Sequence, residues 1–337
     1  MLGAHGAFAD LVFSLIEQLV GLEGCSCLRV DRFDMIDFSA DPERILLCNY
    51  PSNQIVSAIA RDDLKVLLLL EPSADTQQFM QQALGVEPLE AIRSQSASAV
   101  ANLALGRCRN IGILEQSRGQ SMLQLIDSIG LNLGLSRAQN QWMSLADQSS
   151  EDLGPEANVV DVLAKRAKGW SKDAQATHSP DTGRAWSEVC GDVIDGALAM
   201  ALFGSARPIV WPTEVFSVAA PRSSDHPTGV ALTGQSRNIY YGPYFYLPPS
   251  SYRVEIFVNF SSDATPVPFS LEVHAGAWLS RTTIDHWRPG RFRGAFDLVH
   301  TDATTTVEIR LRNLAEISRG SLSLVEVLFY AKREESL

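Results

Sequence analysis

Residues 240–260 read YYGPYFYLPPSSYRVEIFVNF and decide the fold of the second half of the chain. From Tyr252 to Phe260 every second residue is a large apolar one, and Arg253, Glu255 and Asn259 lie between them. Such alternation predicts a β-strand with one face in the core and the other toward solvent. The two prolines before it predict a turn, preceded by a first, aromatic strand. The stretch therefore predicts a β-sandwich.

Further alternating runs follow at residues 269–275, 292–298, 307–312 and 321–330. In the last run the apolar residues change phase. Leu322 and Leu324 have one parity, whereas Val325, Val327 and Phe329 have the other, and a β-bulge near Leu324 would bring both sets into one core. About eight strands with no helix between them, over roughly 125 residues, fit an all-β, jelly-roll-like sandwich.

The first half has the sequence pattern of an α/β fold, in which strands alternate with helices. Short, continuous apolar runs at residues 44–51, 65–72 and 110–115 are typical of strands buried on both faces of a parallel sheet. Helical patterns lie around them, at residues 8–22, 52–60, 75–84, 89–105, 120–129 and 186–203. This alternation predicts a mainly parallel sheet. Gly204 and Pro208 end the last helix, so we place the boundary between an α/β domain, residues 1–204, and an all-β domain, residues 205–337.

Composition excludes some classes of function. The 337 residues carry 28 Lys and Arg against 39 Asp and Glu, a formal net charge of −11. This argues against nucleic acid as a partner, because such surfaces neutralise phosphates with Lys and Arg. The apolar segment 8–22 lacks a basic start and is too short for a membrane span, so we expect a core helix, no transmembrane segment and a cytoplasmic protein. The sequence does not exclude a homo-oligomer.

The five cysteines give no sign of a metal site or a disulfide framework. They are odd in number and widely spread, which fits reduced thiols. Cys25 and Cys27 have no second Cys or His pair at a spacing that would complete a zinc site. We therefore predict no metal.

Candidate ligand contacts in the first half follow its first apolar run. In parallel sheets, ligands bind beyond the carboxyl ends of the strands. Asn49, Ser52, Asn53 and Gln54 fall at such an end. The alternative is that these residues only form a turn and cap the next helix, since both need the same residue types.

The order of elements over about residues 44–136 resembles a bacterial sulfotransferase scaffold, a relative of the P-loop folds. That family follows its first strand with a basic residue, Gly and Thr or Ser, whose N–H groups and cation hold phosphate. Here Pro51 is followed by Ser-Asn-Gln, with neither glycine nor a cation. The family's second strand ends in Arg-Asp-Pro, where this chain has Leu70-Glu71-Pro72. The resemblance therefore implies a degenerate phosphate loop at residues 49–54, no bound sulfate donor and no cofactor.

The second half resembles carbohydrate-binding-like β-sandwich modules of bacterial glycosyltransferases and polysaccharide-biosynthesis proteins. The likeness lies in residues 240–260, LEVHAG at 271–276, VEIRLR at 307–312 and GSLSLVEV at 320–327. Sugar recognition needs flat apolar faces and planar polar groups. The candidates of these types for binding carbohydrate or a partner are Arg237, Tyr240, Tyr241, Tyr244, Trp278, Arg281, His286 and Trp287. For each, packing in the core or at the rim is the alternative, and the group around Trp278, Arg281 and Trp287 is the better candidate for an exposed role.

No catalytic residues are predicted. His274 with Glu272 could be imagined as an acid–base pair, but i,i+2 pairs in a strand recur by chance. No nucleophile-elbow, zinc-protease or dinucleotide fingerprint is present. We therefore predict a non-catalytic binding or regulatory component of bacterial exopolysaccharide biosynthesis, which binds a glycan or a polysaccharide-synthesis protein. The alternatives are an active sugar- or sulfate-transferring enzyme with an anion site at Arg118 and Gly119, and a structural assembly factor whose sandwich docks a protein.

Overall fold

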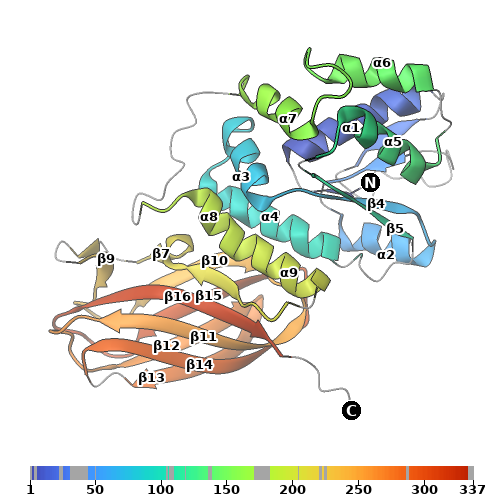
Figure 1. The fold of residues 1–337 in the computed structure, drawn as a ribbon. Helices are drawn as coiled ribbons and strands as arrows, with labels where there is room; N and C mark the ends of the chain where they lie inside the picture. The colour runs from blue at the N-terminus through green and yellow to red at the C-terminus, as the bar shows by residue number, and fades with distance from the viewer. Residues whose placement is uncertain are drawn as a thin grey trace. The chain divides into compact units, whose positions relative to one another are not determined.

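The computed structural model describes residues 2–3, 6–22, 26–30, 45–49, 51–103, 105, 110–117, 119–135, 139–170, 183–203, 205–219, 222–223, 226–285 and 288–332. The chain divides into two compact units, residues 1–175 and 176–337. Figure 1 shows helices around short strands in the first unit and long strands in the second.

The first unit combines helices with two small parallel sheets. One sheet has the strand order β1–β4–β5, and the other pairs β2 with β3. The strands are β1 Leu2–Gly3, β2 Cys27–Arg29, β3 Ile45–Leu47, β4 Val66–Leu70 and β5 Ile111–Glu115. The helices are α1 Ala7–Leu22, α2 Asn53–Arg61, α3 Ser73–Gln82, α4 Pro88–Leu103, α5 Met122–Leu133, α6 Gln139–Ser149 and α7 Val159–Ala167. The three predicted strands are present, but they lie in two small parallel sheets and not in one mainly parallel sheet. Strand β1 and helices α6 and α7 are additions to the prediction.

Strand β4 illustrates why a continuous apolar run forms a strand in this unit. Leu67 and Leu69 pack in one core with residues of α1, α5, α6 and α7. Val66 and Leu68 point the other way and pack with Ile55 of α2. Because both faces are buried, the strand has no polar alternation.

The end of β4 is tied to the beginning of α1. The Glu71 carboxylate accepts a hydrogen bond from the backbone N–H of Phe8 at 2.8 Å and one from the Thr76 hydroxyl at 2.5 Å. Gly6 leaves room for it, since a Cβ at this position would lie 1.0 Å from Oε1 of Glu71. A carboxylate suits this place because the first N–H groups of a helix have no partner within the helix. Burial nevertheless raises the pKa of Glu71 to about 7, although these hydrogen bonds act to lower it.

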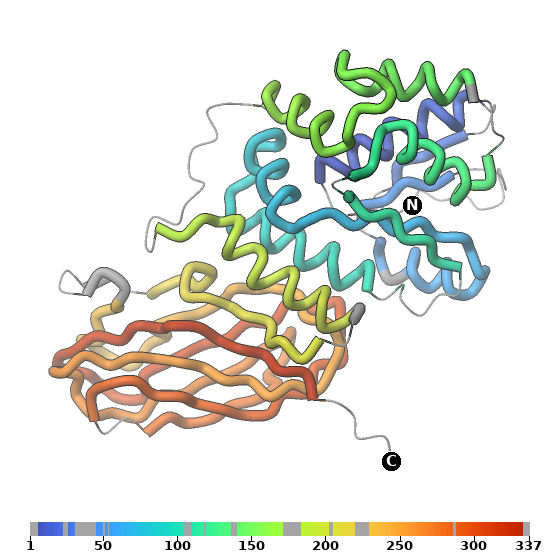
Figure 2. The backbone as a smooth tube through the Cα atoms, in the orientation of Figure 1, coloured from blue at the N-terminus to red at the C-terminus, as the bar shows by residue number. Residues whose placement is uncertain are grey.

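The second unit contains two antiparallel sheets. The five-stranded sheet has the order β13–β12–β15–β10–β7, and the six-stranded sheet has the order β14–β11–β16–β9–β8, with β6 also paired to β16. The strands of the first sheet are β7 Ser217–Val218, β10 Asn238–Tyr246, β12 Pro268–Ala275, β13 Ala277–Asp285 and β15 Thr306–Asn313. Those of the second are β6 Ile209–Pro212, β8 Arg222–Ser223, β9 His226–Ala231, β11 Ser250–Phe260, β14 Gly290–His300 and β16 Ser321–Ala331. Figure 2 traces the backbone of both sheets.

Aromatic side chains fill the space between the two sheets. The Trp211 ring of β6 lies 4.3 Å from Phe329 and 5.6 Å from Phe245, measured between ring centroids, so residues of both sheets meet on it. Phe260 and Phe269 form a similar contact across the sheets at 5.1 Å. The predicted sandwich is confirmed, and its core contains the inward residues of the predicted alternating runs.

The phase change in the last strand is a β-bulge, as predicted. The register between β11 and β16 shifts at Val258, which pairs with Leu324 while the preceding Phe257 pairs with Glu326. Val325 is the extra residue and is exposed, whereas Leu324 and Val327 are both buried. The bulge therefore brings the two sets of apolar residues into one core.

A helical run precedes the sandwich and belongs to the same unit. It consists of α8 Trp186–Cys190, the π-helix η3 Gly191–Asp195 and α9 Gly196–Phe203. Gly196 lies close to β6, since a Cβ added to it would lie 3.3 Å from the Cα of Ile209. Arg184, just before α8, is 2.8 Å from Asp192 and 3.8 Å from Glu214, which follows β6. Because these contacts join the run to the strands, the chain divides between residues 175 and 176 and not near residue 204.

Two further expectations concern a membrane-spanning helix and the cysteines. In the described part of the chain, no helix has the length and apolarity to cross a membrane. The described cysteines, Cys27, Cys48 and Cys190, form no disulfide, and the last two are buried. Cys25 and Cys108 lie outside the described residues.

Candidate functional site

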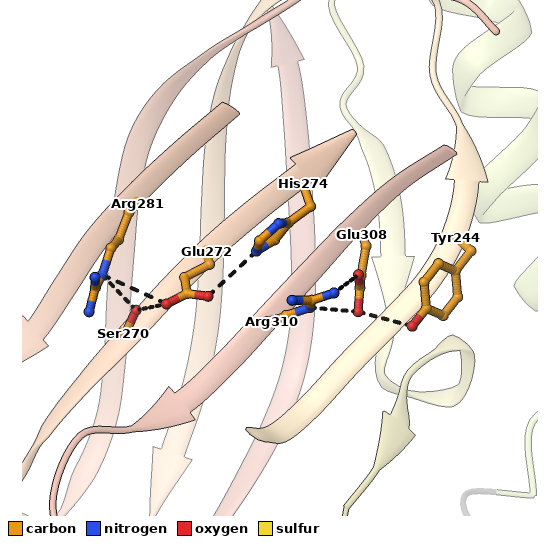
Figure 3. Close-up of polar contacts among 7 residues, drawn as sticks. All are labelled: Tyr244, Ser270, Glu272, His274, Arg281, Glu308 and Arg310. Atoms are coloured by element: carbon orange, nitrogen blue, oxygen red, sulfur yellow. Dashed lines mark hydrogen bonds and ion pairs between the residues drawn. The ribbon is translucent and has the colours of Figure 1, made fainter. Parts of the chain in front are cut away.

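The outer face of the five-stranded sheet carries a cluster of polar and aromatic side chains. On β12, Phe269, Leu271 and Val273 are buried in the sandwich core. Their neighbours Ser270, Glu272 and His274 therefore point to the opposite face, because successive side chains of a strand alternate. Figure 3 shows these three side chains beside those of β10, β13 and β15.

Strand register aligns this cluster in two rows across the sheet. Glu272 pairs with Arg281 of β13 on one side and with Arg310 of β15 on the other. His274 pairs in the same way with Trp278 and Glu308. Strand β10 extends the rows, since Tyr241 pairs with Arg310 and Pro243, next to Tyr244, pairs with Glu308. One row is Arg281, Glu272, Arg310 and Tyr241, and the other is Trp278, His274, Glu308 and Tyr244.

Two bulges turn the aromatic ends of the rows onto this face. On β13, the register shifts between Ser280 and Trp278, which places Trp278 opposite His274 and makes Leu279 the extra residue. On β10, Tyr244 is the extra residue between Pro243 and Phe245. Its φ of 67° is a left-handed conformation that non-glycine residues rarely adopt. Bulges re-aim side chains in this way at functional sites.

The Glu272 carboxylate is the centre of one group of contacts. It accepts a hydrogen bond from the Ser270 hydroxyl at 2.9 Å, and His274 Nε2 lies 3.5 Å from its other oxygen. Arg281 Nε donates to Ser270 Oγ at 3.1 Å and lies 3.7 Å from Glu272. The residue is only 7% exposed. A carboxylate with so little exposure to solvent needs hydrogen-bond and ion-pair partners to offset the cost of burying its charge.

A second group surrounds Glu308, which is 6% exposed. Arg310 donates to both of its oxygens, from Nε at 2.9 Å and from a terminal nitrogen at 2.6 Å. The Tyr244 hydroxyl donates to the same carboxylate at 3.0 Å. Burial, together with this bond to a carboxylate, raises the pKa of Tyr244. The two hydrogen bonds between Arg310 and Glu308 fix the planes of the guanidinium and the carboxylate. The remaining donors of Arg310 and acceptors of Glu308 therefore have defined directions.

Trp278 is the most prominently exposed aromatic residue of the cluster on β12 and β13. It is 59% exposed, which is unusual for so large an apolar ring. The Arg281 guanidinium lies 5.6 Å from its ring centre, and the His274 ring meets it edge-on at 5.6 Å. These contacts hold the ring in place beside the buried carboxylate of Glu272.

The geometry does not support hydrolysis by a serine triad, although Ser270, Glu272 and His274 are adjacent. In such triads the imidazole lies between the hydroxyl and the carboxylate and takes the hydroxyl proton. Here the carboxylate lies between the other two and accepts from the serine directly. Among the residues that the structure describes, no group of His, Cys, Asp and Glu is arranged to hold a metal ion.

The structure places four of the predicted binding residues on the same face of the five-stranded sheet: Trp278, Arg281, Tyr241 and Tyr244. Tyr240 does not join them, because it is 2% exposed and its hydroxyl donates to a backbone carbonyl of β16, in the core. This is the alternation that places neighbouring Tyr241 outside.

Arg237 has a structural role. Its guanidinium donates to the carbonyl oxygens of Ala231 and Thr233, and its backbone N–H donates to Asn313. It therefore holds the loop between β9 and β10. His286 and Trp287, which were also predicted to bind, lie outside the described residues.

The predicted phosphate-loop position is a helix cap. Ser52 Oγ accepts a hydrogen bond from the N–H of Ile55 at 3.3 Å and caps α2. The Asn49 carbonyl accepts from Ser98 of α4, and Gln54 is exposed. Asn53 begins α2, and its side chain lies outside the described residues. The capping alternative is thus the one seen for Ser52.

Comparison with known proteins gives no family. No protein-family model matches the chain, and no curated protein matches it. Among solved structures, an insecticidal delta-endotoxin Cry8Ea1 from Bacillus thuringiensis matches 37% of this chain and 24% of its own, with 15% identity and a TM-score of 0.29.

Two further solved structures are described as carbohydrate-binding modules. The CBM36-1 domain of a multidomain xylanase from the hindgut metagenome of Trinervitermes trinervoides matches 37% of this chain and 98% of its own, with 12% identity and a TM-score of 0.27. A CBM36 module in complex with calcium and xylotriose matches 34% and 89%, with 16% identity and a TM-score of 0.24. At such low TM-scores the likeness is not evidence for a function.

Proposed function

We propose that the outer face of the five-stranded sheet binds carbohydrate. The observation that carries this proposal is the 59% exposed Trp278 ring, held between Arg281 and His274, beside the nearly buried carboxylate of Glu272. The side chains of the sandwich core lie on the other face of the sheet. Packing in the core therefore does not explain an exposed indole next to oriented charged groups.

The chemistry of a sugar ring matches this arrangement. One side of a pyranose presents C–H groups, which pack on a flat aromatic face, and its edge presents hydroxyls. A carboxylate accepts from hydroxyls and a guanidinium donates to them, in directions fixed by their planes. Arg281 provides such a group 5.6 Å from the Trp278 ring centre, and Glu272 provides another 3.7 Å from Arg281.

Native gel electrophoresis in the presence of soluble polysaccharides tests the proposal. We expect hydroxyethyl cellulose, xylan or galactomannan to retard the full chain, and Trp278→Ala to abolish the retardation. Phe257→Ala is the matched control, because Phe257 lies on the six-stranded sheet and also carries an arginine, Arg291, 5.2 Å from its ring. Retardation that is lost equally in both variants, or never seen with any polysaccharide, would contradict the proposal.

The role in the cell that we propose is a non-catalytic binding component of bacterial exopolysaccharide biosynthesis. Support comes from the first unit, where the chain has Leu70 in place of the arginine that the resemblance to sulfotransferases calls for, followed by the acidic Glu71. Its carboxylate occupies the N-terminus of α1 and would repel a phosphate group. Calorimetric titration with adenosine 3′,5′-bisphosphate should therefore show no binding. Tight binding of this nucleotide would overturn the non-catalytic role and leave the carbohydrate site unaffected.

A further inference from the structure

The site has an aromatic residue at each end of the sheet face that the two rows cover. Trp278 is on β13, whereas Tyr241 and Tyr244 are on β10. The order β13–β12–β15–β10 leaves two strands between them. With neighbouring strands about 4.8 Å apart, the two ends are separated by roughly 14 Å. That is longer than a single sugar ring and longer than a disaccharide.

Polar groups occupy the whole distance between these ends. Glu272 and His274 of β12 come next to Trp278, and Glu308 and Arg310 of β15 come next to the tyrosines. Each offers donors or acceptors to hydroxyl groups in addition to those used within the protein. The Arg281 guanidinium, for example, uses Nε for Ser270 and Glu272, and five N–H groups are present on such a side chain.

The formal charges of the two rows cancel in pairs. Arg281 offsets Glu272 at 3.7 Å, and Arg310 offsets Glu308 at 2.6 Å. A charged ligand would have to compete with these internal partners, and removing the arginine from a nearly buried carboxylate is costly. An uncharged ligand needs no such exchange, because it only adds hydrogen bonds.

Resting on the proposed function, we infer that the ligand is an uncharged oligosaccharide longer than a disaccharide, which lies across the strands from Trp278 to Tyr241. One sugar packs on Trp278, the middle sugars bond to the paired charges, and another sugar packs on the tyrosine end. The site therefore binds several consecutive sugars of an oligosaccharide, and a shorter sugar fills only part of it.

This arrangement makes the effect of each aromatic residue depend on the length of the ligand. Trp278→Ala weakens the binding of every ligand that the face accepts. Tyr241→Ala weakens only ligands long enough to reach β10, by about tenfold for the loss of one aromatic contact. Tyr241→Phe keeps the ring and restores the affinity.

The experiment is a titration of the full chain with cello-, xylo- and manno-oligosaccharides, each from the monosaccharide to the hexasaccharide. We expect affinity to rise from the disaccharide to the tetrasaccharide, and Tyr241→Ala to remove that rise and Tyr241→Phe to keep it. Tyr330→Ala, on the six-stranded sheet, is the control and should bind as the native chain does. Added sodium chloride should leave the affinity unchanged, since the ligand carries no charge.

The two proposals fail in different ways. If no carbohydrate of any length binds, the proposed function is wrong. If a monosaccharide binds as tightly as a tetrasaccharide, or if Tyr241→Ala affects all lengths equally, the site still binds carbohydrate but the inference about length and direction is overturned. Preference for oligogalacturonate over its uncharged counterparts, with loss of affinity in salt, would overturn the inference of an uncharged ligand.

Discussion

Replacing Glu71 with glutamine should change how the stability of the first unit depends on pH. Burial raises the pKa of this carboxyl from 4.5 to about 7 in the folded chain. The folded state therefore binds the proton more tightly than the unfolded state. Protonation stabilises the fold fully below pH 4.5, and this contribution is lost as the pH rises through about 7. The difference between the two pKa values corresponds to about 3 kcal/mol of unfolding free energy.

Glutamine removes the titration and preserves the contacts. Its oxygen can accept from the Phe8 N–H as Glu71 Oε2 does, and its amide can donate to the Thr76 hydroxyl, which both donates and accepts. At pH 5 the variant should therefore be nearly as stable as the native chain. At pH 8 it should be more stable, by up to about 3 kcal/mol, because the native chain then buries a charge.

Urea unfolding of the full chain, followed by hydrogen exchange of peptides from α1, measures the first unit separately. Glu115→Gln is the control, since Glu115 ends the neighbouring strand β5 at the position paired with Leu70 but is exposed. The quantity to compare is the difference in stability between variant and native chain at pH 5 and pH 8. If Glu71→Gln differed from the native chain in stability by the same amount at pH 5 and pH 8, or if Glu115→Gln showed the same pH response, the buried Glu71 carboxyl would not be the cause of the pH dependence.

Three other substitutions test the packing. Gly6→Ala should destabilise the first unit by about 1 kcal/mol or more, because the new Cβ would lie 1.0 Å from Oε1 of Glu71 and displace this cap of α1; unchanged α1 exchange would contradict this. Trp211→Ala should cost about 3–5 kcal/mol of sandwich stability in thermal unfolding, since it removes a fully buried ring that lies 4.3 Å from Phe329. A loss under 1 kcal/mol would mean that the two sheets do not meet on this ring. Tyr252→Phe should cost about 1 kcal/mol in urea unfolding, since its buried hydroxyl donates to a backbone carbonyl four residues earlier, and a neutral effect would mean that this bond contributes nothing.

The sequence was informative where one physical rule decides the structure. Alternation from Tyr252 to Phe260 predicted a half-buried strand, and these residues are the inward face of β11. The phase change around Leu324 predicted a bulge for the same reason, because one extra residue is the simplest way to bring both parities into one core. Periodicity also located α1, whose apolar residues face the core of the first unit.

The candidate site was only partly predictable, because its residues meet through strand register. Trp278 and Arg281 were predicted from their types and their closeness in sequence. Glu308 lies on a different strand, and nothing in its sequence context indicates that it pairs with His274. The signal that could have found it is the outward parity of β15, where Glu308 alternates with buried Val307 and Ile309.

Backbone irregularities and long-range packing account for the remaining differences. The bulge at Tyr244 re-aims one tyrosine of a run whose other members alternate, and no residue preference reveals it. The boundary between the units was placed too late because Gly204 and Pro208 only mark the end of a helix. They do not show which unit that helix packs against.

The central claim is that carbohydrate binds to the outer face of the five-stranded sheet. Backbone amide chemical shifts of the full chain, recorded while an uncharged tetrasaccharide such as cellotetraose, xylotetraose or mannotetraose is added, test it most directly. We predict that the largest shifts occur on β12, β13 and β15, at Glu272, Arg281 and Arg310, and that the Trp278 indole N–H moves with them. Shifts confined to β11 and β14 of the other sheet, or none with any of the three sugars, would contradict the claim.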